Sequence, residues 1–183
     1  NIKYLNYDLM RIISRLDIKS ENLIKGIQFE GLRVIGDPNK FALKYYEDKA
    51  DEIILIDTVA SLYNRNNLVE IIKEASENIF IPITAGGGIR TTKDVENLLR
   101  NGADKIFLNT GAVKTPNLIN ELVKEFGSQS VVSSIEAKKI SLNKWEVYTE
   151  NGRERTNIDV EQWLLEVIDR GAGEIILTSI DND

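Results

Sequence analysis

The chain has 183 residues, 42% of them hydrophobic, and its 23 basic and 29 acidic side chains give a formal net charge of −6. This size and composition suit one globular domain with a sizeable core. The acidic balance argues against nucleic acid or an anionic membrane as a partner. No run of roughly 18 apolar residues and no charged segment leading into an apolar stretch occurs, so we expect neither a membrane span nor a secretion signal.

Two absent residue types narrow the possible chemistry. The chain contains no cysteine and no histidine. Disulfides, thiol nucleophiles, zinc–thiolate sites, histidine triads and histidine–metal sites are therefore excluded, and we expect no metal site. Acid–base catalysis must fall to Asp, Glu, Lys or Tyr. The lack of cysteine suits a reducing compartment, and we expect the protein to be cytoplasmic.

Short runs rich in Ile and Val alternate with longer amphipathic segments, a pattern typical of βαβ units on a parallel sheet. The runs predict strands at about residues 10–16, 52–57, 80–84, 104–108, 130–136 and 174–179. The amphipathic segments predict helices at about residues 38–49, 65–77, 91–101, 115–126 and 159–170.

Local signals support the helix boundaries. Asp37-Pro38 and Thr115-Pro116 each predict an N-cap followed by proline at the first helical position. Three helices are followed by a glycine, which is typical of a C-cap: Gly102, Gly127 and Gly171.

Two segments predict excursions from the strand–helix pattern. Asn151-Gly152, between residues 144–149 and 153–155, indicates a hairpin turn after the fifth strand. Residues 22–29 could form a similar excursion after the first strand. Residues 1–8 show no periodicity and are expected to be an irregular lead-in, which leaves residues 9–183 as a single domain.

One phrase occurs twice in the chain. Ala50–Leu55 (ADEIIL) reads again as Ala172–Leu177 (AGEIIL), and Leu16–Lys19 corresponds to Ile135–Lys138 at nearly the same offset. Such self-similarity indicates an architecture of repeated units. We therefore predict an α/β fold, a (β/α)8 TIM barrel of the half-barrel-repeat type. Each copy would place one carboxylate at the barrel mouth.

The number of units falls short of a complete barrel. About six of eight β/α units are present, whereas a complete barrel runs to about 250 residues. An open edge would expose apolar surface and unpaired backbone groups. We expect either that the chain is incomplete or that something else closes the barrel.

Several stretches in order resemble the cyclase subunit of imidazole glycerol phosphate synthase (HisF), over essentially the whole chain after Asp8. The stretches are residues 11–19 (RIISRLDIK), 31–33 (GLR), 36–38 (GDP), 85–90 (AGGGIR), 102–110 (GADKIFLNT), 126–129 (FGSQ) and 171–179 (GAGEIILTS). The resemblance implies an enzyme that uses ammonia from a glutaminase partner. Its substrate would be a phosphoribulosyl-formimino intermediate of histidine biosynthesis, with no organic cofactor.

The resemblance assigns the acid–base residues. Asp17 matches the family's first catalytic aspartate, and Glu136 stands where histidine-pathway members carry the second. Glu keeps the charge but moves the carboxylate outward, and a shift of about 1 Å can cost roughly 100-fold in a preorganised site. Lys25 matches a lysine on a mobile loop after the first strand. It could neutralise a substrate phosphate.

A phosphate site is also expected. Gly86–Gly88 follows a strand and precedes a helix, so that backbone N–H groups can approach an anion, and Gly88 is our candidate there. Asn109 and Thr110 add side-chain donors after the fourth strand. Thr178 and Asp183, at the end of the sixth strand, complete the expected substrate-binding residues.

Four charged residues at strand beginnings match the ring around the family's ammonia entrance: Arg11, Glu52, Lys105 and Glu174. Two cations and two anions in one ring balance their charges, which lowers the desolvation cost. The ring would serve as an ammonia gate, and the charges around it as the docking surface of a glutaminase. The alternative is a structural salt-bridge cluster that only seals the barrel.

Three other functions stay open. Glu136, with Arg15–Asp17 and Val59–Tyr63, looks like the branch associated with surface polysaccharides, in which ammonia amidates a sugar. An isomerase of the sister barrel family would share the repeat and the paired acids but needs no gate. A third possibility is a non-catalytic activator or scaffold of a glutaminase.

Overall fold

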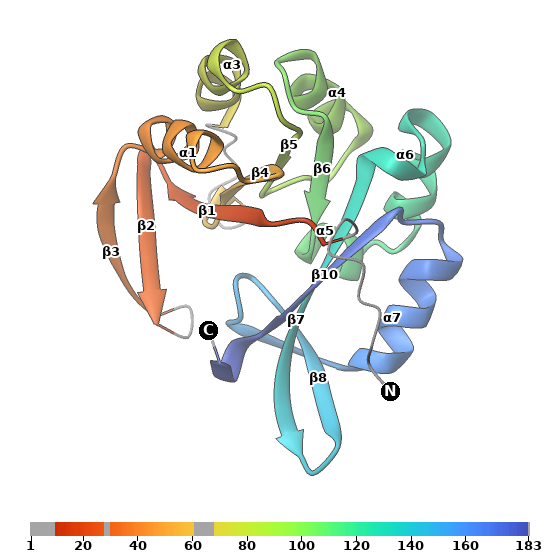
Figure 1. The fold of residues 1–183 in the computed structure, drawn as a ribbon. Helices are drawn as coiled ribbons and strands as arrows, with labels where there is room; N and C mark the ends of the chain where they lie inside the picture. The colour runs from red at the N-terminus through yellow and green to blue at the C-terminus, as the bar shows by residue number, and fades with distance from the viewer. Residues whose placement is uncertain (1–9, 28–29, 61–67, 183) are drawn as a thin grey trace, which may run out of the picture.

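A computed structural model describes residues 10–27, 30–60 and 68–182, and its strands form one curved sheet (Figure 1). Of the described strands, six run parallel in the order β1-β4-β5-β6-β7-β10. These are β1 (Ile13–Lys19), β4 (Glu52–Asp57), β5 (Ile83–Gly86), β6 (Lys105–Leu108), β7 (Val131–Ser141) and β10 (Glu174–Ser179). Each predicted strand is present, with ends shifted by a few residues.

Helices cover the outer side of this sheet (Figure 1). They are α1 (Pro38–Glu47), α3 (Leu68–Asn78), α4 (Thr92–Arg100), α6 (Asn117–Phe126) and α7 (Val160–Asp169), and a short helix, α5 (Thr110–Lys114), follows β6. The helices predicted at 38–49, 91–101, 115–126 and 159–170 are confirmed, as is the described part of the one predicted at 65–77. The short α5 was not predicted, because five residues are too few for a helical period.

The caps explain most helix boundaries. The Asp37 carboxylate accepts the Lys40 N–H at 3.0 Å, and Pro38 opens α1 as predicted. The predicted cap at Thr115-Pro116 is wrong: Pro116 itself is the N-cap residue of α6 and makes no side-chain cap hydrogen bond. At the other ends, the predicted glycines follow α4, α6 and α7 with left-handed φ angles: Gly102, Gly127 and Gly171.

Alternate residues of each parallel strand face two different apolar layers. Ile53 and Leu55 of β4 pack with the helices in the main core. Ile54 and Ile56 instead join a second cluster with Phe107, Val132, Ile13 and Ile176, all of them strand residues. A sheet wall with helices on one side and a strand-only apolar interior on the other is the construction of a TIM barrel. The predicted fold class is therefore observed.

Two antiparallel excursions leave the barrel wall. β2 (Asn22–Ile27) and β3 (Glu30–Gly36) form a hairpin beside β1, as expected for the segment after the first strand, although residues 28–29 lie outside the described residues. β7 extends well past the predicted residue 136 and pairs with β8 (Lys144–Thr149). β8 then turns at Asn151-Gly152, as predicted, into β9 (Glu154–Asp159).

The internal repeat is visible in the strand register. Asp17 on β1 lies opposite Ile56 on β4, and Glu136 on β7 lies opposite Thr178 on β10, which are corresponding pairs of the two sequence copies. The two pairs of strands are therefore equivalent units of one barrel wall. β10 pairs only with β7 among the described residues, so the wall is open there. The predicted lead-in at residues 1–8 lies outside the described residues.

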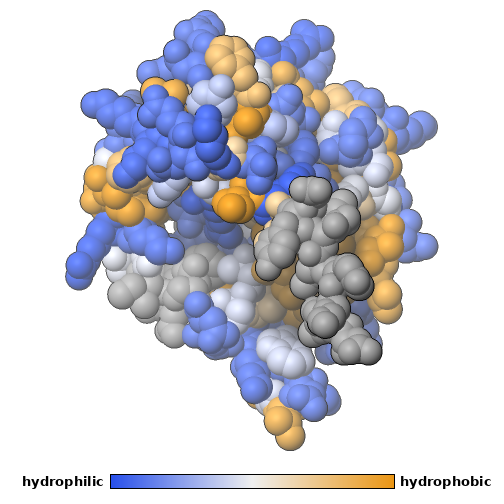
Figure 2. All heavy atoms as spheres, in the orientation of Figure 1, coloured by the Kyte–Doolittle hydropathy of each residue, from blue (hydrophilic) through white to orange (hydrophobic). Residues whose placement is uncertain are grey.

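One apolar feature of the surface is the tip of the β7–β8 hairpin. Figure 2 shows a mostly hydrophilic face, with an apolar tip where the β7–β8 hairpin projects. Ile140 and Leu142 stand on this hairpin with 52% and 82% of their surface exposed. No helix in the described ranges has both the length and the apolar character needed to span a bilayer.

Candidate active site

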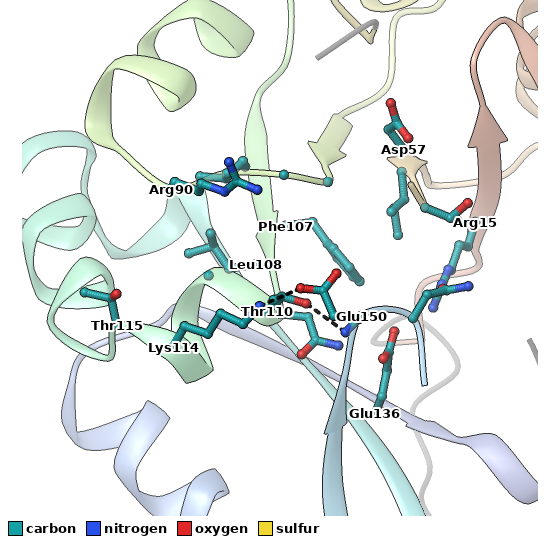
Figure 3. A pocket seen from close by; sticks show the side chains of 18 residues that line it. Arg15, Asp57, Arg90, Phe107, Leu108, Thr110, Lys114, Thr115, Glu136 and Glu150 are labelled. Carbon is teal, nitrogen blue, oxygen red and sulfur yellow. Dashed lines mark hydrogen bonds and ion pairs between the residues drawn. The ribbon is translucent and has the colours of Figure 1, made fainter. Parts of the chain in front are cut away.

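A cavity of about 260 Å³ opens at the carboxyl ends of the parallel strands (Figure 3). Its walls come from the ends of β1, β4, β6 and β7, the loop after β5, helix α5 and the turn between β8 and β9. Four of the expected site residues line the cavity: Gly88, Asn109, Thr110 and Glu136. In TIM barrels this end of the strands carries the active site.

Glu136 is a buried carboxylic acid at this cavity. It is 3% exposed, and the backbone N–H of Gly152 donates to its Oε2 at 2.9 Å. Burial raises the pKa of Glu136 to about 7, the negative charge of Asp17 adds to the shift, and the positive charge of Arg15 opposes it. A carboxyl group with this pKa can both give and accept a proton near neutral pH.

Asp17 stands on the same side of the barrel wall as Glu136. β1 turns Leu16 and Ile18 toward the helices, so Arg15 and Asp17 face the interior. Arg15 Nε donates to Asp17 Oδ1 at 2.8 Å, and its guanidinium lies 5.7 Å from the centre of the Phe107 ring. The strand predicted at residues 10–16 would place Asp17 just after its end, but β1 continues to Lys19, so Asp17 lies within the strand. It is not itself a wall residue of the cavity.

The glycine turn after β5 packs closely against Asp57 and Ala60. Gly87 and Gly88 have φ angles of +109° and +67°, and a Cβ on Gly88 would lie 2.8 Å from that of Ala60. This turn therefore needs glycine for packing, whether or not an anion binds there. Both amide atoms of Asn109 are buried and neither makes a hydrogen bond of good geometry, but the amide lies close enough to Glu136 to lower the pKa of that carboxyl. A polar ligand can supply the well-aligned partner that such a buried amide lacks.

Five charged wall residues were not predicted as site residues: Arg15, Asp57, Arg90, Lys114 and Glu150. Asp57 ends the buried run of β4, and burial raises its pKa while the N–H of Val59 opposes the shift. A carboxylate directly after a buried strand could have been found from the sequence. Glu150 could not, because its place depends on how the hairpin folds back.

Two expected substrate-binding residues, Lys25 and Thr178, do not line the cavity. Lys25 is in strand β2, opposite Arg33, and not on a loop; it does not line the cavity. Thr178 lies next to Glu136 in the register of β10 and β7 but is not a wall residue either. Asp183 lies outside the described residues.

The four residues expected to form a charged ring meet at the opposite end of the barrel. Arg11 binds Glu52 at 3.1 Å and Glu174 at 3.0 Å. Lys105 Nζ binds the same two carboxylates at 2.8 and 2.7 Å. Each cation thus bridges both anions, and the ring closes. We refer to Arg11, Glu52, Lys105 and Glu174 as the charged ring.

The charged ring is partly withdrawn from water. Glu52 is 1% exposed and also accepts the hydroxyl of Thr84 at 2.5 Å. Burial alone would raise the pKa of Glu174, but hydrogen bonds from Arg11 and Lys105 outweigh burial and lower it. A charge-balanced ring of this kind seals the barrel end at a smaller desolvation cost than separate charges would.

Comparison with known proteins agrees with this geometry. A family model described as "Histidine biosynthesis protein" matches residues 11–183. The chain is 59% identical over 174 residues to the imidazole glycerol phosphate synthase subunit HisF of Legionella pneumophila, covering 95% of this chain and 82% of that protein. It is 47% identical over 179 residues to the subunit of that name in Campylobacter concisus, covering 98% of this chain and 71% of the relative.

A third relative extends the pattern. The HisF subunit of Dictyoglomus thermophilum is 46% identical over 173 residues, which cover 94% of this chain and 69% of that protein. Identities of this size over nearly the whole chain, together with the family match, show the family of this chain. The chain belongs to the HisF family of histidine biosynthesis proteins.

Proposed function

We propose that the chain is the cyclase subunit of an imidazole glycerol phosphate synthase, a lyase of histidine biosynthesis. It uses ammonia from a HisH-like glutaminase to convert a phosphoribulosyl-formimino aminoimidazole carboxamide ribotide to imidazole glycerol phosphate. The observation that carries this proposal is one barrel interior with a closed charged ring at its base, Glu136 on the cavity wall at its other end, and Asp17 near enough to act on Glu136 through its charge. The names of its relatives support it, and we expect a cytoplasmic enzyme.

The two carboxylates carry the proton transfers. Ring closure and cleavage both require protons to move near neutral pH, and general acid–base catalysis contributes about 10²- to 10⁴-fold. Glu136, with a pKa of about 7, can donate a proton in one step and accept one in the next. Asp17 supplies the second carboxylate, and its orientation is fixed by Arg15 at 2.8 Å.

The cavity would hold one end of the substrate. Its volume of about 260 Å³ lies just below the usual range of ligand pockets, roughly 300–1,000 Å³, and suits one phosphorylated end. Gly88, Asn109 and Thr110 are the proposed phosphate contacts. Lys25, Thr178 and Asp183 remain proposals for the rest of the substrate.

The charged ring is proposed as the ammonia entrance. Ammonia is small and neutral, so it can cross the apolar interior of Ile54, Phe107 and Val132 once one ion pair of the ring opens. A glutaminase bound at this end would deliver ammonia directly. An isomerase of the sister family would have no use for such an entrance.

Turnover with two nitrogen sources tests the proposal. The chain is assayed on the ribotide substrate with ammonium chloride alone, and with glutamine plus the glutaminase. Imidazole glycerol phosphate should form in both, and a charged-ring variant, Lys105→Met, should alter the glutamine-dependent rate selectively. If the chain accelerates glutamine hydrolysis but no ammonia-dependent product forms, the chain is a glutaminase activator.

One residue favours a second candidate, the ammonia-dependent amidation of a surface-polysaccharide sugar. Glu136 carries one methylene more than the aspartate that the family resemblance implies, and it is buried against Gly152. Glu136→Asp should raise activity on the histidine-pathway substrate if the longer side chain reflects a different acceptor. Lower activity would assign Glu136 to the histidine-pathway reaction itself.

A further inference from the structure

Lys114 and Glu150 form an ion pair on the same cavity wall as the proposed phosphate contacts. Lys114, at the end of α5, donates from Nζ to Glu150 Oε1 at 2.7 Å (Figure 3). The Glu150 side chain is 5% exposed and that of Lys114 is 58% exposed. The carboxylate is thus inside the cavity wall, while the cation reaches it from solvent.

The chain holds Glu150 there through an unusual turn. Glu150 and Asn151 have φ angles of +53° and +58°, and Gly152 follows at +74°. Two successive non-glycine residues in the left-handed region cost free energy, so the contacts of the turn must compensate. Glu150 N–H donates to Thr110 Oγ1 at 3.0 Å, and Gly152 N–H donates to Glu136 at 2.9 Å.

The position is one where an anion is expected. Thr110 and Asn109, proposed to bind phosphate, are wall residues together with Glu150, and the Asn109 amide, which lies near Glu136, makes no hydrogen bond of good geometry. Arg90 lines the same cavity and adds a second positive charge (Figure 3). The Glu150 carboxylate binds a lysine that a phosphate would use, and the Glu150 backbone N–H donates to the hydroxyl oxygen of Thr110 beside it.

We infer that Glu150 occupies part of the phosphate site while no substrate is bound, and that Lys114 is the cation that exchanges Glu150 for the substrate phosphate. The inference rests on the phosphate site proposed above. Lys114 becomes a substrate-binding residue, and Glu150 a competing internal anion.

Exchange has a consequence for Glu136. A carboxylate and a phosphate that share one lysine repel each other, so Glu150 must withdraw. Its withdrawal moves the turn that also carries the Gly152 N–H. Phosphate binding is therefore coupled to the hydrogen bond that Glu136 accepts from Gly152, which lies two residues after Glu150 in the same turn.

Inorganic phosphate binding, measured by titration calorimetry on the full chain, tests the inference. Glu150→Gln removes the charge but keeps an oxygen for Lys114, and it should tighten phosphate binding about tenfold. Lys114→Met should weaken binding about tenfold, and Lys114→Arg should restore it. Lys124→Met, an exposed lysine on α6, is the matched control and should change nothing.

A measurement on the wild-type chain tests the inference without relying on variants that could fold poorly. The amide protons of Glu150 and Gly152 are followed by hydrogen exchange, and phosphate should accelerate the exchange of both. Unchanged exchange in the presence of bound phosphate overturns the inference. Unchanged or weaker phosphate binding by a folded Glu150→Gln variant does so as well.

The outcomes also separate this inference from the proposed function. If the wild-type chain binds phosphate and Glu150→Gln binds it equally, the inference fails and the phosphate site stands. If neither binds phosphate, both fail, while ammonia-dependent turnover still tests the cyclase assignment. Binding seen only in Glu150→Gln supports the competing anion most directly.

Discussion

Gly152 donates its backbone N–H to Oε2 of Glu136 across 2.9 Å, which places the turn between β8 and β9 directly on a proposed catalytic acid. The β8–β9 hairpin is therefore part of the site. Because the same turn also reaches Thr110, one short segment contacts both the acid–base group and the phosphate side of the cavity.

The pKa of Glu136 predicts a pH-dependent stability. In the folded chain this pKa is about 7, against 4.5 in the unfolded chain, so the folded state binds the proton more tightly. Protonation of Glu136 therefore stabilises the folded state by about 3 kcal/mol below pH 4.5, and this stabilisation is lost as the pH rises through 7. Urea unfolding from pH 4.5 to 8 should show this decline in the wild type and not in Glu136→Gln.

Asp17→Asn should abolish most ammonia-dependent turnover. Removing a general acid–base group costs about 10²- to 10⁴-fold, and asparagine can still accept the hydrogen bond from Arg15. Initial rates with saturating ammonium chloride and circular dichroism of the folded variant measure the two effects. Asp169→Asn, on the exposed face of α7, serves as the control, and normal turnover by Asp17→Asn would remove this residue from the mechanism.

Lys105→Met should destabilise the chain. Glu52 is 1% exposed and would lose one of its two cations, and removing one partner of a buried ion pair costs about 3–5 kcal/mol. Arg11 and Thr84 still contact Glu52, so we expect about 3 kcal/mol in urea unfolding. Lys124→Met should change the free energy of unfolding by less than about 0.5 kcal/mol. Equal losses in the two variants would mean that the ring adds no stability.

Gly87→Ala should be far more costly than Gly31→Ala. A Cβ on Gly87 would collide with the backbone carbonyl of Asp57, at a φ of +109°. Gly31 has a φ of +62° and no atom within 4 Å of its built Cβ, so its cost is about 1 kcal/mol, from conformation alone. Thermal unfolding of both variants gives the comparison. A similar loss in the two would show that the collision is relieved by a small backbone shift.

The alternation of apolar runs and amphipathic segments predicted the barrel wall because fully buried parallel strands have that composition. The duplicated sequence also predicted that the two halves are equivalent. The strand register agrees, because Asp17 pairs with Ile56 as Glu136 pairs with Thr178. The extension of β7 to Ser141 was missed because Lys138 and Lys139 interrupt the apolar run, although the projecting end of β7 is largely exposed and tolerates them.

The site was only partly predictable. Residues at the predicted strand ends, such as Glu136 and Asn109, follow from the rule that barrel chemistry lies at the carboxyl ends. Glu150 was missed because its burial depends on a left-handed turn folding back onto Thr110, a tertiary contact with no local signal. Lys25 was expected on a loop, but the alternation after Asn22 continues as a strand pairing with β3.

The charged ring also bears on how the chain folds. Arg11 precedes the first parallel strand and Glu174 begins the last one described, yet the two are in direct contact. Until these distant segments meet, Glu52 cannot be enclosed with its full set of partners, and contacts of such long sequence separation form late and slowly. Assembly of the barrel base is thereby a natural marker for completion of folding, separable in time from formation of the individual strand–helix units.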